Sequence, residues 1–128
     1  MDGIKYGKKY ILAYDLGTGG NKAVLYSSHG KLISKKFIAY DTIYPQTGWA
    51  EHDPLDCWKS IVDSTTALMN QSGVKGNEIA CISISGHGMG IVPVDINGRL
   101  LRKTTPIWFD SRAVNQTQRF MEKIGYER

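Results

Sequence analysis

The sequence lacks any apolar run that approaches the roughly 20 residues needed to cross a bilayer. Its start carries a basic cluster, but the apolar stretch that follows, about five residues, is shorter than the core of a signal peptide. The net charge is +4, but the sequence has no dense Lys/Arg block and no alternation of arginine with aromatic residues. It therefore does not indicate a nucleic-acid interface. These absences predict a cytoplasmic protein that acts neither on nucleic acid nor at a membrane. The diffuse positive charge suits an anionic ligand.

Cysteine is also scarce. The two cysteines, Cys57 and Cys81, show no C-x-x-C spacing and have no histidine at metal-ligand spacing nearby. A disulfide framework and a structural zinc site are therefore not expected. Because Cys57 falls in a helical pattern and Cys81 in a strand pattern, we expect both to be small buried hydrophobic residues.

What is present is an alternation of β-rich runs and helical patterns. The first three runs form a predicted β-meander with a glycine-rich turn between its first two strands. An Asn97-Gly98 turn separates the last predicted strand from a short continuation at 99–101. The predicted strands are Tyr10–Tyr14, Lys22–Tyr26, Leu32–Tyr40, Ile79–Ser85 and Ile91–Asp95.

Two helices are predicted. The first runs from about Pro54 to Gln71, with Asp53 as N-cap, and the second covers roughly Ser111–Ile124. Three- and four-residue spacing predicts one apolar face on the first helix, formed by Trp58, Ile61, Val62, Thr65, Leu68 and Met69. No linker or repeat divides the chain, so residues 1–128 are expected to form one α/β domain with a mixed sheet flanked by helices.

The most informative segment is the turn Asp15-Leu16-Gly17-Thr18-Gly19-Gly20-Asn21-Lys22. Glycines let backbone N–H groups approach phosphate oxygens, and the Thr18 hydroxyl and Lys22 ammonium can add donors. Asp15, at the end of a strand, can hold a hydrated Mg²⁺, which prefers one or two carboxylates plus water and phosphate. The pattern is neither a P-loop nor a dinucleotide-binding fingerprint. A plain hairpin turn is the alternative.

The turn from Asp15 to Lys22 resembles the first phosphate-binding motif of the actin, hexokinase and heat-shock ATPase superfamily, which has a ribonuclease-H-like fold. Three later segments narrow this to the FGGY carbohydrate kinases: Gly48–Pro54 with Trp58, Ile84–Gly90 with Val94-Asp95, and Ile107–Arg112. The four motifs occur in the family's order and span nearly the whole chain. The xylulokinase-like branch fits best, because glycerol kinases usually carry Arg-Glu where this chain has Gly88-Met89.

The resemblance implies ATP and Mg²⁺ as cofactors and a sugar site in a cleft between this domain and a second one. The turn residues Asp15, Gly17, Thr18, Gly19, Gly20, Asn21 and Lys22 would bind the nucleotide phosphates, with Asp15 organising the metal. The sugar would lie against His87, Gly88, Met89, Trp108, Asp110 and Arg112. Met89 stands where xylulokinases usually present a sugar-contacting histidine, which puts xylulose itself in doubt.

Each of these sugar-site residues also has a structural alternative. Trp108 could pack in the core, Asp110 could cap the helix that follows, and Arg112 could be a surface ion-pair partner. His87 sits on a glycine-flanked break, which favours a loop role, and core burial is the alternative. The segment of Trp49, Glu51 and His52 is expected to fix the loop ahead of the first helix.

The resemblance predicts a kinase that phosphorylates a sugar or polyol hydroxyl, most simply a ketopentose such as xylulose. In the family, the catalytic aspartate and the adenosine-binding elements lie downstream of the region matched here. The chain is therefore expected to be a partial N-terminal domain, inactive alone and a weak nucleotide binder, and a homodimer of the full-length protein is compatible with the family. Two alternatives remain: a non-catalytic nucleotide-binding module of the actin or chaperone type, and a superfamily phosphatase.

Overall fold

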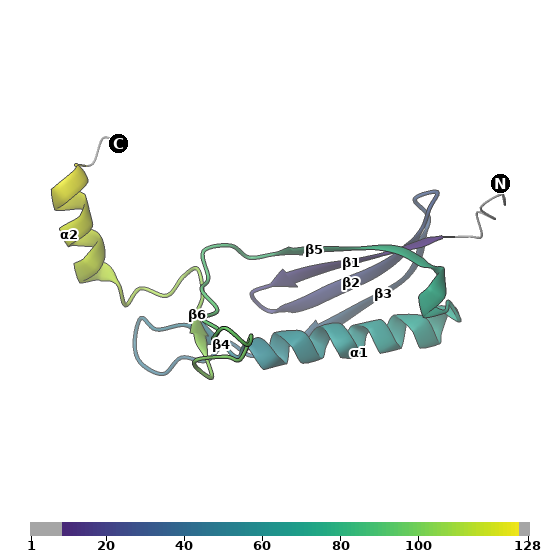
Figure 1. The fold of residues 1–128 in the computed structure, drawn as a ribbon, viewed down its shortest axis with the longest axis horizontal. Coiled ribbons are helices and arrows are strands. Elements are labelled where there is room, and N and C mark those ends of the chain that lie inside the picture. Colours follow the sequence, from purple (N-terminus) through teal and green to yellow (C-terminus); the bar gives the residue numbers. More distant parts are fainter. Residues whose placement is uncertain (1–8, 126–128) are drawn as a thin grey trace.

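A computed structural model describes residues 9–125. A four-stranded sheet has the order β3-β2-β1-β5, and helix α1 covers one of its faces (Figure 1). Strands β1, β2 and β3 form the predicted antiparallel meander, and β5 pairs with β1 in parallel, so the sheet is mixed as expected. The elements are β1 Tyr10–Gly17, β2 Gly20–Ser27, β3 Leu32–Ala39, β4 Glu51–His52, α1 Pro54–Ser72, the short 3₁₀ helix η1 Gly76–Glu78, β5 Ile79–Gly86, β6 Thr105–Pro106 and α2 Val114–Ile124.

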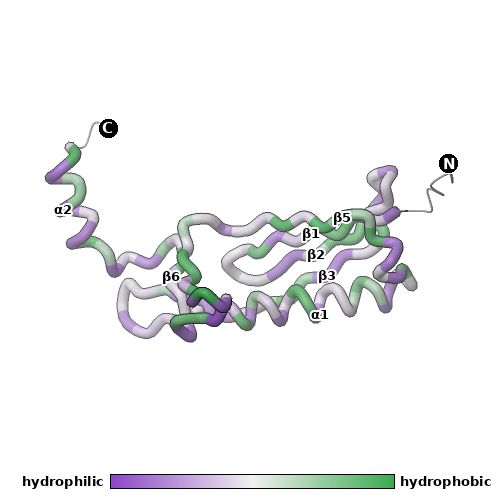
Figure 2. Tube along the Cα trace, in the orientation of Figure 1, coloured by the Kyte–Doolittle hydropathy of each residue, from purple (hydrophilic) through white to green (hydrophobic). Residues whose placement is uncertain are grey.

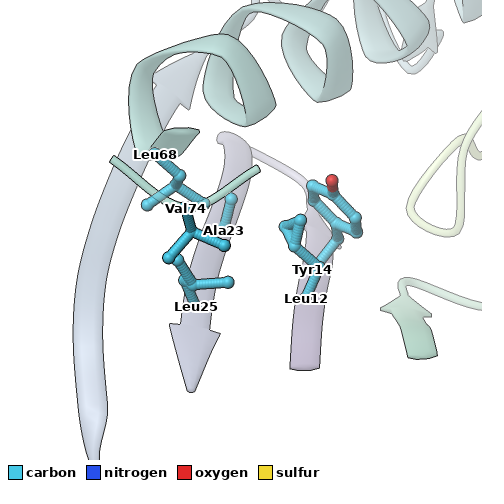
Figure 3. Close-up of a cluster of buried hydrophobic side chains, with 6 residues drawn as sticks. All are labelled: Leu12, Tyr14, Ala23, Leu25, Leu68 and Val74. Carbon is cyan, nitrogen blue, oxygen red and sulfur yellow. The ribbon is translucent and has the colours of Figure 1, made fainter. Parts of the chain in front are cut away.

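The core lies between the sheet and α1. Alternate residues of β1 and β2 point to the helix, and the buried cluster consists of Leu12, Tyr14, Ala23, Leu25, Leu68 and Val74 (Figure 3). The Tyr14 hydroxyl, within this apolar layer, makes a 2.6 Å hydrogen bond with the hydroxyl of Thr65 on α1. Burying a tyrosine in this way requires such a partner for its hydroxyl group.

Helix α1 begins as predicted, and only part of its predicted apolar face packs against the sheet. The Asp53 carboxylate accepts from the Leu55 amide at 2.9 Å, and Gly73 ends the helix in the left-handed conformation. The residues that α1 buries are Ser60, Ser64 and Leu68, at four-residue spacing, whereas Trp58 and Val62 are exposed. Leu68, Ile61 and Met69 pack in or against the core, as predicted. The prediction was wrong for Trp58 and Val62.

The physical reason is a polar contact that hydrophobic periodicity cannot reveal. The Asn21 amide on β2 donates to the Ser60 carbonyl at 3.1 Å and to the Ser64 hydroxyl at 3.0 Å. The two serines are small enough for β2 to approach α1 closely, and their hydroxyls donate back to helix carbonyls at Cys57 and Ile61. Close approach and hydrogen bonding thus determine the orientation of the helix.

Strand β5 confirms the predicted run, but its side chains are largely exposed. Ile82 and Ile84 lie on the uncovered surface of the strand, and Figure 2 shows apolar residues concentrated along β1 and β5. Cys81 is exposed as well, so the expectation that it is buried was wrong, while Cys57 is half-buried. Among the described residues, β5 forms an edge of the sheet and pairs only with β1.

The predicted strand Ile91–Asp95 is absent. Only an isolated bridge joins Val94 to Leu100 across the predicted Asn97-Gly98 turn, whose Gly98 amide donates to the Asp95 carbonyl at 3.0 Å. The β-branched residues of this run have no neighbouring strand to pair with in the part of the chain that the structure describes. Propensity without a partner does not produce a strand.

A second, two-stranded sheet joins β4 and β6 and lies beside the end of the main sheet at which β1 terminates (Figure 1). Helix α2 follows it and extends away from the sheet in the same view. The predicted second helix began at Ser111, but α2 begins at Val114, because Ser111 donates both its amide and its hydroxyl to the Gly48 carbonyl. Those bonds keep residues 110–113 out of the helix.

Candidate functional site

The glycine-rich turn is the tip of the β1–β2 hairpin. Gly17 pairs with Gly20, which leaves Thr18 and Gly19 as the two turn residues. A Cβ atom built on Gly19 would meet nothing within 4 Å, so the outer side of the tip is open space. A phosphate group could therefore approach the backbone at Gly19 without displacing any described residue.

Gly20 has a different role. Its φ is +146°, and a Cβ atom there would lie 2.5 Å from the Ile38 carbonyl oxygen and 2.9 Å from the Ala39 Cα. Glycine is required at this position by the backbone of β3 and by its own backbone conformation. Gly19 thus leaves the outer side of the turn open, whereas Gly20 allows β2 and β3 to approach each other closely.

Asp15 and Lys22 face each other across the hairpin as register partners. The Lys22 ammonium lies 3.1 Å from the Asp15 carboxylate, and both side chains are well exposed. An exposed pair of this kind contributes little to stability. Both charged groups are consequently free to change partners when an anion or a cation arrives.

Asn21 turns inward, away from these groups. Its side chain is 0% exposed, and its amide donates to Ser60 and Ser64 on α1. We expected Asn21 among the phosphate-binding residues, but its side chain cannot reach the outer side of the turn. Any contact of Asn21 with a ligand would have to come from its backbone.

Three aromatic side chains support the end of β1. The Tyr40 hydroxyl donates to the Gly17 carbonyl at 2.6 Å, and the His52 ring packs edge-on against the rings of Tyr40 and His87 at 5.2 and 5.3 Å. The amide of His87 donates to the Leu16 carbonyl at 3.1 Å. The two carbonyls that precede the turn are therefore both occupied by residues from distant parts of the chain.

The ionisation of this cluster follows from its surroundings. Burial, with the neighbouring His87, lowers the pKa of His52 below its usual value, so His52 is neutral near pH 7. Burial also raises the pKa of the Tyr40 hydroxyl, which stays protonated as a donor. Sequence reasoning did not identify Tyr40, because its partner lies 23 residues away and no local pattern signals the contact.

A pocket with a volume of about 520 Å³ opens beside the cluster. Its wall includes the break Gly86–Gly90 together with Leu16, His52, Trp58 and Ile107. Within the break, Met89 has a φ of 60°, the left-handed region that side chains other than glycine rarely adopt, and it is 84% exposed. Such strain gathers at ligand sites, which supports the predicted role of His87, Gly88 and Met89 in lining one.

Trp108 contacts the turn but is not among the residues that line this pocket, although its neighbour Ile107 is. Its indole nitrogen donates to the Thr18 hydroxyl at 2.9 Å, and 51% of its surface is exposed. The alternative of a core tryptophan is therefore excluded. The Phe109 ring packs edge-on against the indole at 5.1 Å.

Asp110 and Arg112 lie in a compact ion-pair cluster with Glu51. Arg112 donates to Asp110 at 2.6 Å and to Glu51 at 2.6 Å, and its guanidinium lies 3.7 Å from the centre of the Trp49 ring. Glu51 is 2% exposed and also accepts from Arg102 at 3.0 Å and from the Thr104 hydroxyl. The expectation that Trp49, Glu51 and His52 have a structural role is confirmed.

The cluster explains two pKa shifts. Hydrogen bonds from Arg112 hold the pKa of Asp110 well below its usual range, against the opposing effect of burial. The hydrogen bond from Thr104 is the largest cause that lowers the pKa of Glu51, and Arg112 and Arg102 act in the same direction. Both carboxylates are therefore ionised at neutral pH.

The structure brings only some of the expected sugar-site residues to the pocket. His87, Gly88 and Met89 line it, whereas Asp110 and Arg112 do not, because their polar atoms are engaged with each other, with Glu51 and with the Ala50 amide. Asp110 does not cap α2 either, since that helix begins after Ala113. It accepts instead from the backbone amides of Ala50 and Arg112, which fixes the segment that carries Trp108.

Residues 10–128 match the sequence profile of the N-terminal domain of the FGGY family of carbohydrate kinases. The chain belongs to this family. Its fold is accordingly that of the actin and hexokinase superfamily, as the turn motif predicted.

Individual members of the FGGY family show the same relationship. The chain is 31% identical over 126 residues to a glycerol kinase of Caldanaerobacter subterraneus, with 91% of this chain and 25% of the relative covered. A "xyloylose kinase" from Brucella ovis has a TM-score of 0.83 at 27% identity, covering 89% of this chain and 24% of that one. A gluconate kinase from Lactobacillus acidophilus has a TM-score of 0.78 at 25% identity, over 94% and 23% of the two chains. The chain thus spans about a quarter of the length of these FGGY kinases.

The relatives differ in the substrates that their names give, so the family defines a carbohydrate kinase but no particular sugar. In the described part of this FGGY domain, no helix is both long and apolar enough to pass through a bilayer. The described residues also contain no group of three or more His, Cys, Asp and Glu side chains arranged to hold a metal ion.

Proposed function

We propose that this chain forms the phosphate-binding turn and one wall of the sugar site of an ATP-dependent kinase that phosphorylates a sugar or polyol hydroxyl. The observation that carries the proposal is the open tip of the β1–β2 hairpin. Gly19 faces empty space there, flanked by Asp15, Lys22 and the Thr18 hydroxyl. Backbone amides, one ammonium and one hydroxyl are the donors that a transferring phosphoryl group requires.

Mg²⁺ bound to ATP fits the residues at this turn. Asp15 offers a half-exposed carboxylate, and the described residues contain no group of three or more acidic, His or Cys side chains that could hold a metal ion by themselves. A Mg²⁺ ion would thus take most of its ligands from phosphate and water, as it does in many nucleotide sites. The ion would neutralise charge on the phosphates, while Lys22 would exchange its contact with Asp15 for one with a phosphate oxygen.

The sugar would lie against the break Gly86–Gly90 and the exposed ring of Trp108. An indole face covers the C–H surface of a sugar, and His87 supplies a polar group in the same region. Gly88-Met89 occupies the place of the Arg-Glu pair that the resemblance assigns to glycerol kinases, so a ketopentose such as xylulose is favoured over glycerol. Asp110 and Arg112 would act on this wall only by holding Trp108 in place.

The test has two arms. The longest reading frame that contains these residues is expressed, and ADP release is followed with D-xylulose, L-xylulose, gluconate and glycerol. Sugar-dependent ADP release is expected, and it should fall by about 100-fold or more in Asp15→Asn, which loses the charge that organises Mg²⁺. ATP hydrolysis at a rate that does not depend on any of the sugars would contradict the kinase proposal and favour the phosphatase alternative.

The second arm uses the 128-residue chain alone. It should bind Mg·ATP only weakly and transfer no phosphoryl group, because residues on one side of a cleft cannot enclose the reacting groups. Ordinary turnover from this chain would show that its own residues include the catalytic base.

A further inference from the structure

The bond between Trp108 and Thr18 joins the two halves of the proposed site. It connects residues 90 positions apart, one on the segment beside the pocket and the other at the tip of the hairpin. The following inference rests on the proposed function, since it concerns how Thr18 meets a phosphate group.

The chemistry of the two groups fixes the direction of this bond. An indole N–H can only donate, so the Thr18 hydroxyl oxygen must be the acceptor. Its own hydrogen then points elsewhere, and no side chain or carbonyl among residues 9–125 accepts it. A phosphate oxygen at neutral pH mainly accepts hydrogen bonds, so a hydroxyl oriented in this way is ready to donate to it.

Trp108 can orient Thr18 because its own backbone is held on both sides. The Ile107 amide donates to the Ala50 carbonyl at 3.0 Å, and the Ala50 amide donates to the Asp110 carboxylate at 2.7 Å. The Asp110 amide closes a turn on the Ile107 carbonyl at 2.9 Å. The indole therefore meets Thr18 from a fixed position.

We propose that Trp108 is a positioning residue for the phosphate turn: its indole N–H orients the Thr18 hydroxyl so that this hydroxyl donates to a phosphate of the nucleotide. The tryptophan ring is needed for this role because of its N–H group. Phenylalanine at the same position would keep a flat apolar ring and lose the orientation of Thr18.

The experiment uses the 128-residue chain labelled with ¹⁵N. Its three tryptophans give three indole N–H signals, and Trp108→Phe identifies the signal of Trp108. Mg·ATP and, separately, inorganic triphosphate are titrated into the millimolar range, and dissociation constants are taken from backbone signals of residues 17–20. The variants are Trp108→Phe, Thr18→Val, the double variant and Thr18→Ser, with Thr66→Val on the exposed side of α1 as the control.

Trp108→Phe and Thr18→Val should each weaken triphosphate binding by about 10-fold or more, as expected for the loss of one hydrogen bond to a charged group. The double variant should be no weaker than Thr18→Val, because Trp108 acts through Thr18. Thr18→Ser should restore most of the affinity, and the Trp108 signal should move in Thr18→Val even without ligand. Thr66→Val should match the unmodified chain.

Two failures are distinguishable. The positioning role is overturned if the unmodified chain and Trp108→Phe bind triphosphate equally well. It is also overturned if the losses in binding free energy of Trp108→Phe and Thr18→Val add up in the double variant. Either result leaves the proposed function untouched. If the unmodified chain shows no shift at residues 17–20 with either probe, the phosphate turn itself is refuted, and the role of Trp108 with it.

Discussion

The Arg112 guanidinium donates to the Glu51 carboxylate at 2.6 Å, although the two residues lie 61 positions apart in the sequence. This contact draws the segment ahead of α1 against the segment that carries Trp108. Glu51 accepts two further hydrogen bonds, from Arg102 and Thr104, and is almost completely buried. The wall of the proposed sugar site therefore depends on a carboxylate that does not line the pocket.

Replacing this carboxylate with an amide should destabilise the protein. In Glu51→Gln the shape is kept but the charge that serves two arginines is lost, so the free energy of unfolding should fall by roughly 1.5–3 kcal/mol. Urea denaturation followed by circular dichroism measures it. Glu122→Gln, at an exposed position on α2, is the matched control and should change the free energy by less than about 0.5 kcal/mol. Equal midpoints for Glu51→Gln and the unmodified chain would contradict the role of Glu51.

The same cluster should make the fold sensitive to acid. Asp110 and Glu51 both have folded-state pKa values below their ordinary values of 3.8 and 4.5. A carboxylate of this kind contributes stability that is complete above its unfolded pKa and is lost as the pH falls toward its folded pKa. Asp110 and Glu51 should therefore cause no change in the urea midpoint between about pH 7 and pH 5.5. Below about pH 4.5 their protonation should lower the midpoint.

Glu51→Gln tests the origin of that decrease. The variant has one fewer depressed carboxylate, so its midpoint should fall less steeply between pH 4.5 and pH 3, where the ordinary pKa values lie. Parallel curves for the two proteins would assign the acid sensitivity to other groups.

Gly19 and Gly20 should respond in opposite ways to the same added methyl group. Gly20→Ala forces a Cβ atom against the backbone of β3 at a positive φ, and a loss of about 2 kcal/mol or more is expected. Gly19→Ala meets open space and should change stability by less than about 0.5 kcal/mol while weakening triphosphate binding. Thermal unfolding and a triphosphate titration of both variants check the pair. Stable Gly20→Ala protein would show that β2 and β3 are farther apart than the structure indicates.

Asn21 should tolerate a carboxylate poorly. In Asn21→Asp, both N–H donors to α1 disappear and a buried charge faces the Ser60 carbonyl, so unfolding at pH 7 should become easier by at least about 2 kcal/mol. Protonation relieves the charge, so the deficit relative to Asn21→Ala should shrink as the pH is lowered toward 5. A deficit that does not depend on pH would mean that water reaches position 21.

Sequence reasoning could predict what local patterns encode. The meander, the first helix with its Asp53 cap and strand β5 follow from residues close together in the chain, and the family follows from four such local motifs in order. The turn at positions 15–22 was located correctly at the tip of the first hairpin. Its role in binding phosphate remains a prediction.

The errors share a physical cause, which is contact between distant residues. Helix α1 buries Ser60 and Ser64 because Asn21 binds there, and no periodicity reports a hydrogen bond across about 40 residues. Asp110 and Arg112 have the composition of sugar ligands, but Arg112 donates to Glu51, 61 positions away, and Asp110 accepts from the Ala50 amide, 60 positions away. The strand predicted at 91–95 needed a neighbouring strand, which local propensity cannot supply.

The hydrogen bonds of Asn21 have a consequence for recognition at the neighbouring turn. Because position 21 directly follows Gly20, one arm of the hairpin is fastened to a 19-residue helix, and the other arm is held through the carbonyls of Leu16 and Gly17. A turn supported in this way loses little conformational entropy when an anion arrives, so its shape is set before binding. If the proposed function holds, selectivity among phosphate donors at this tip should arise from rigid complementarity, and any induced closure should come from other segments.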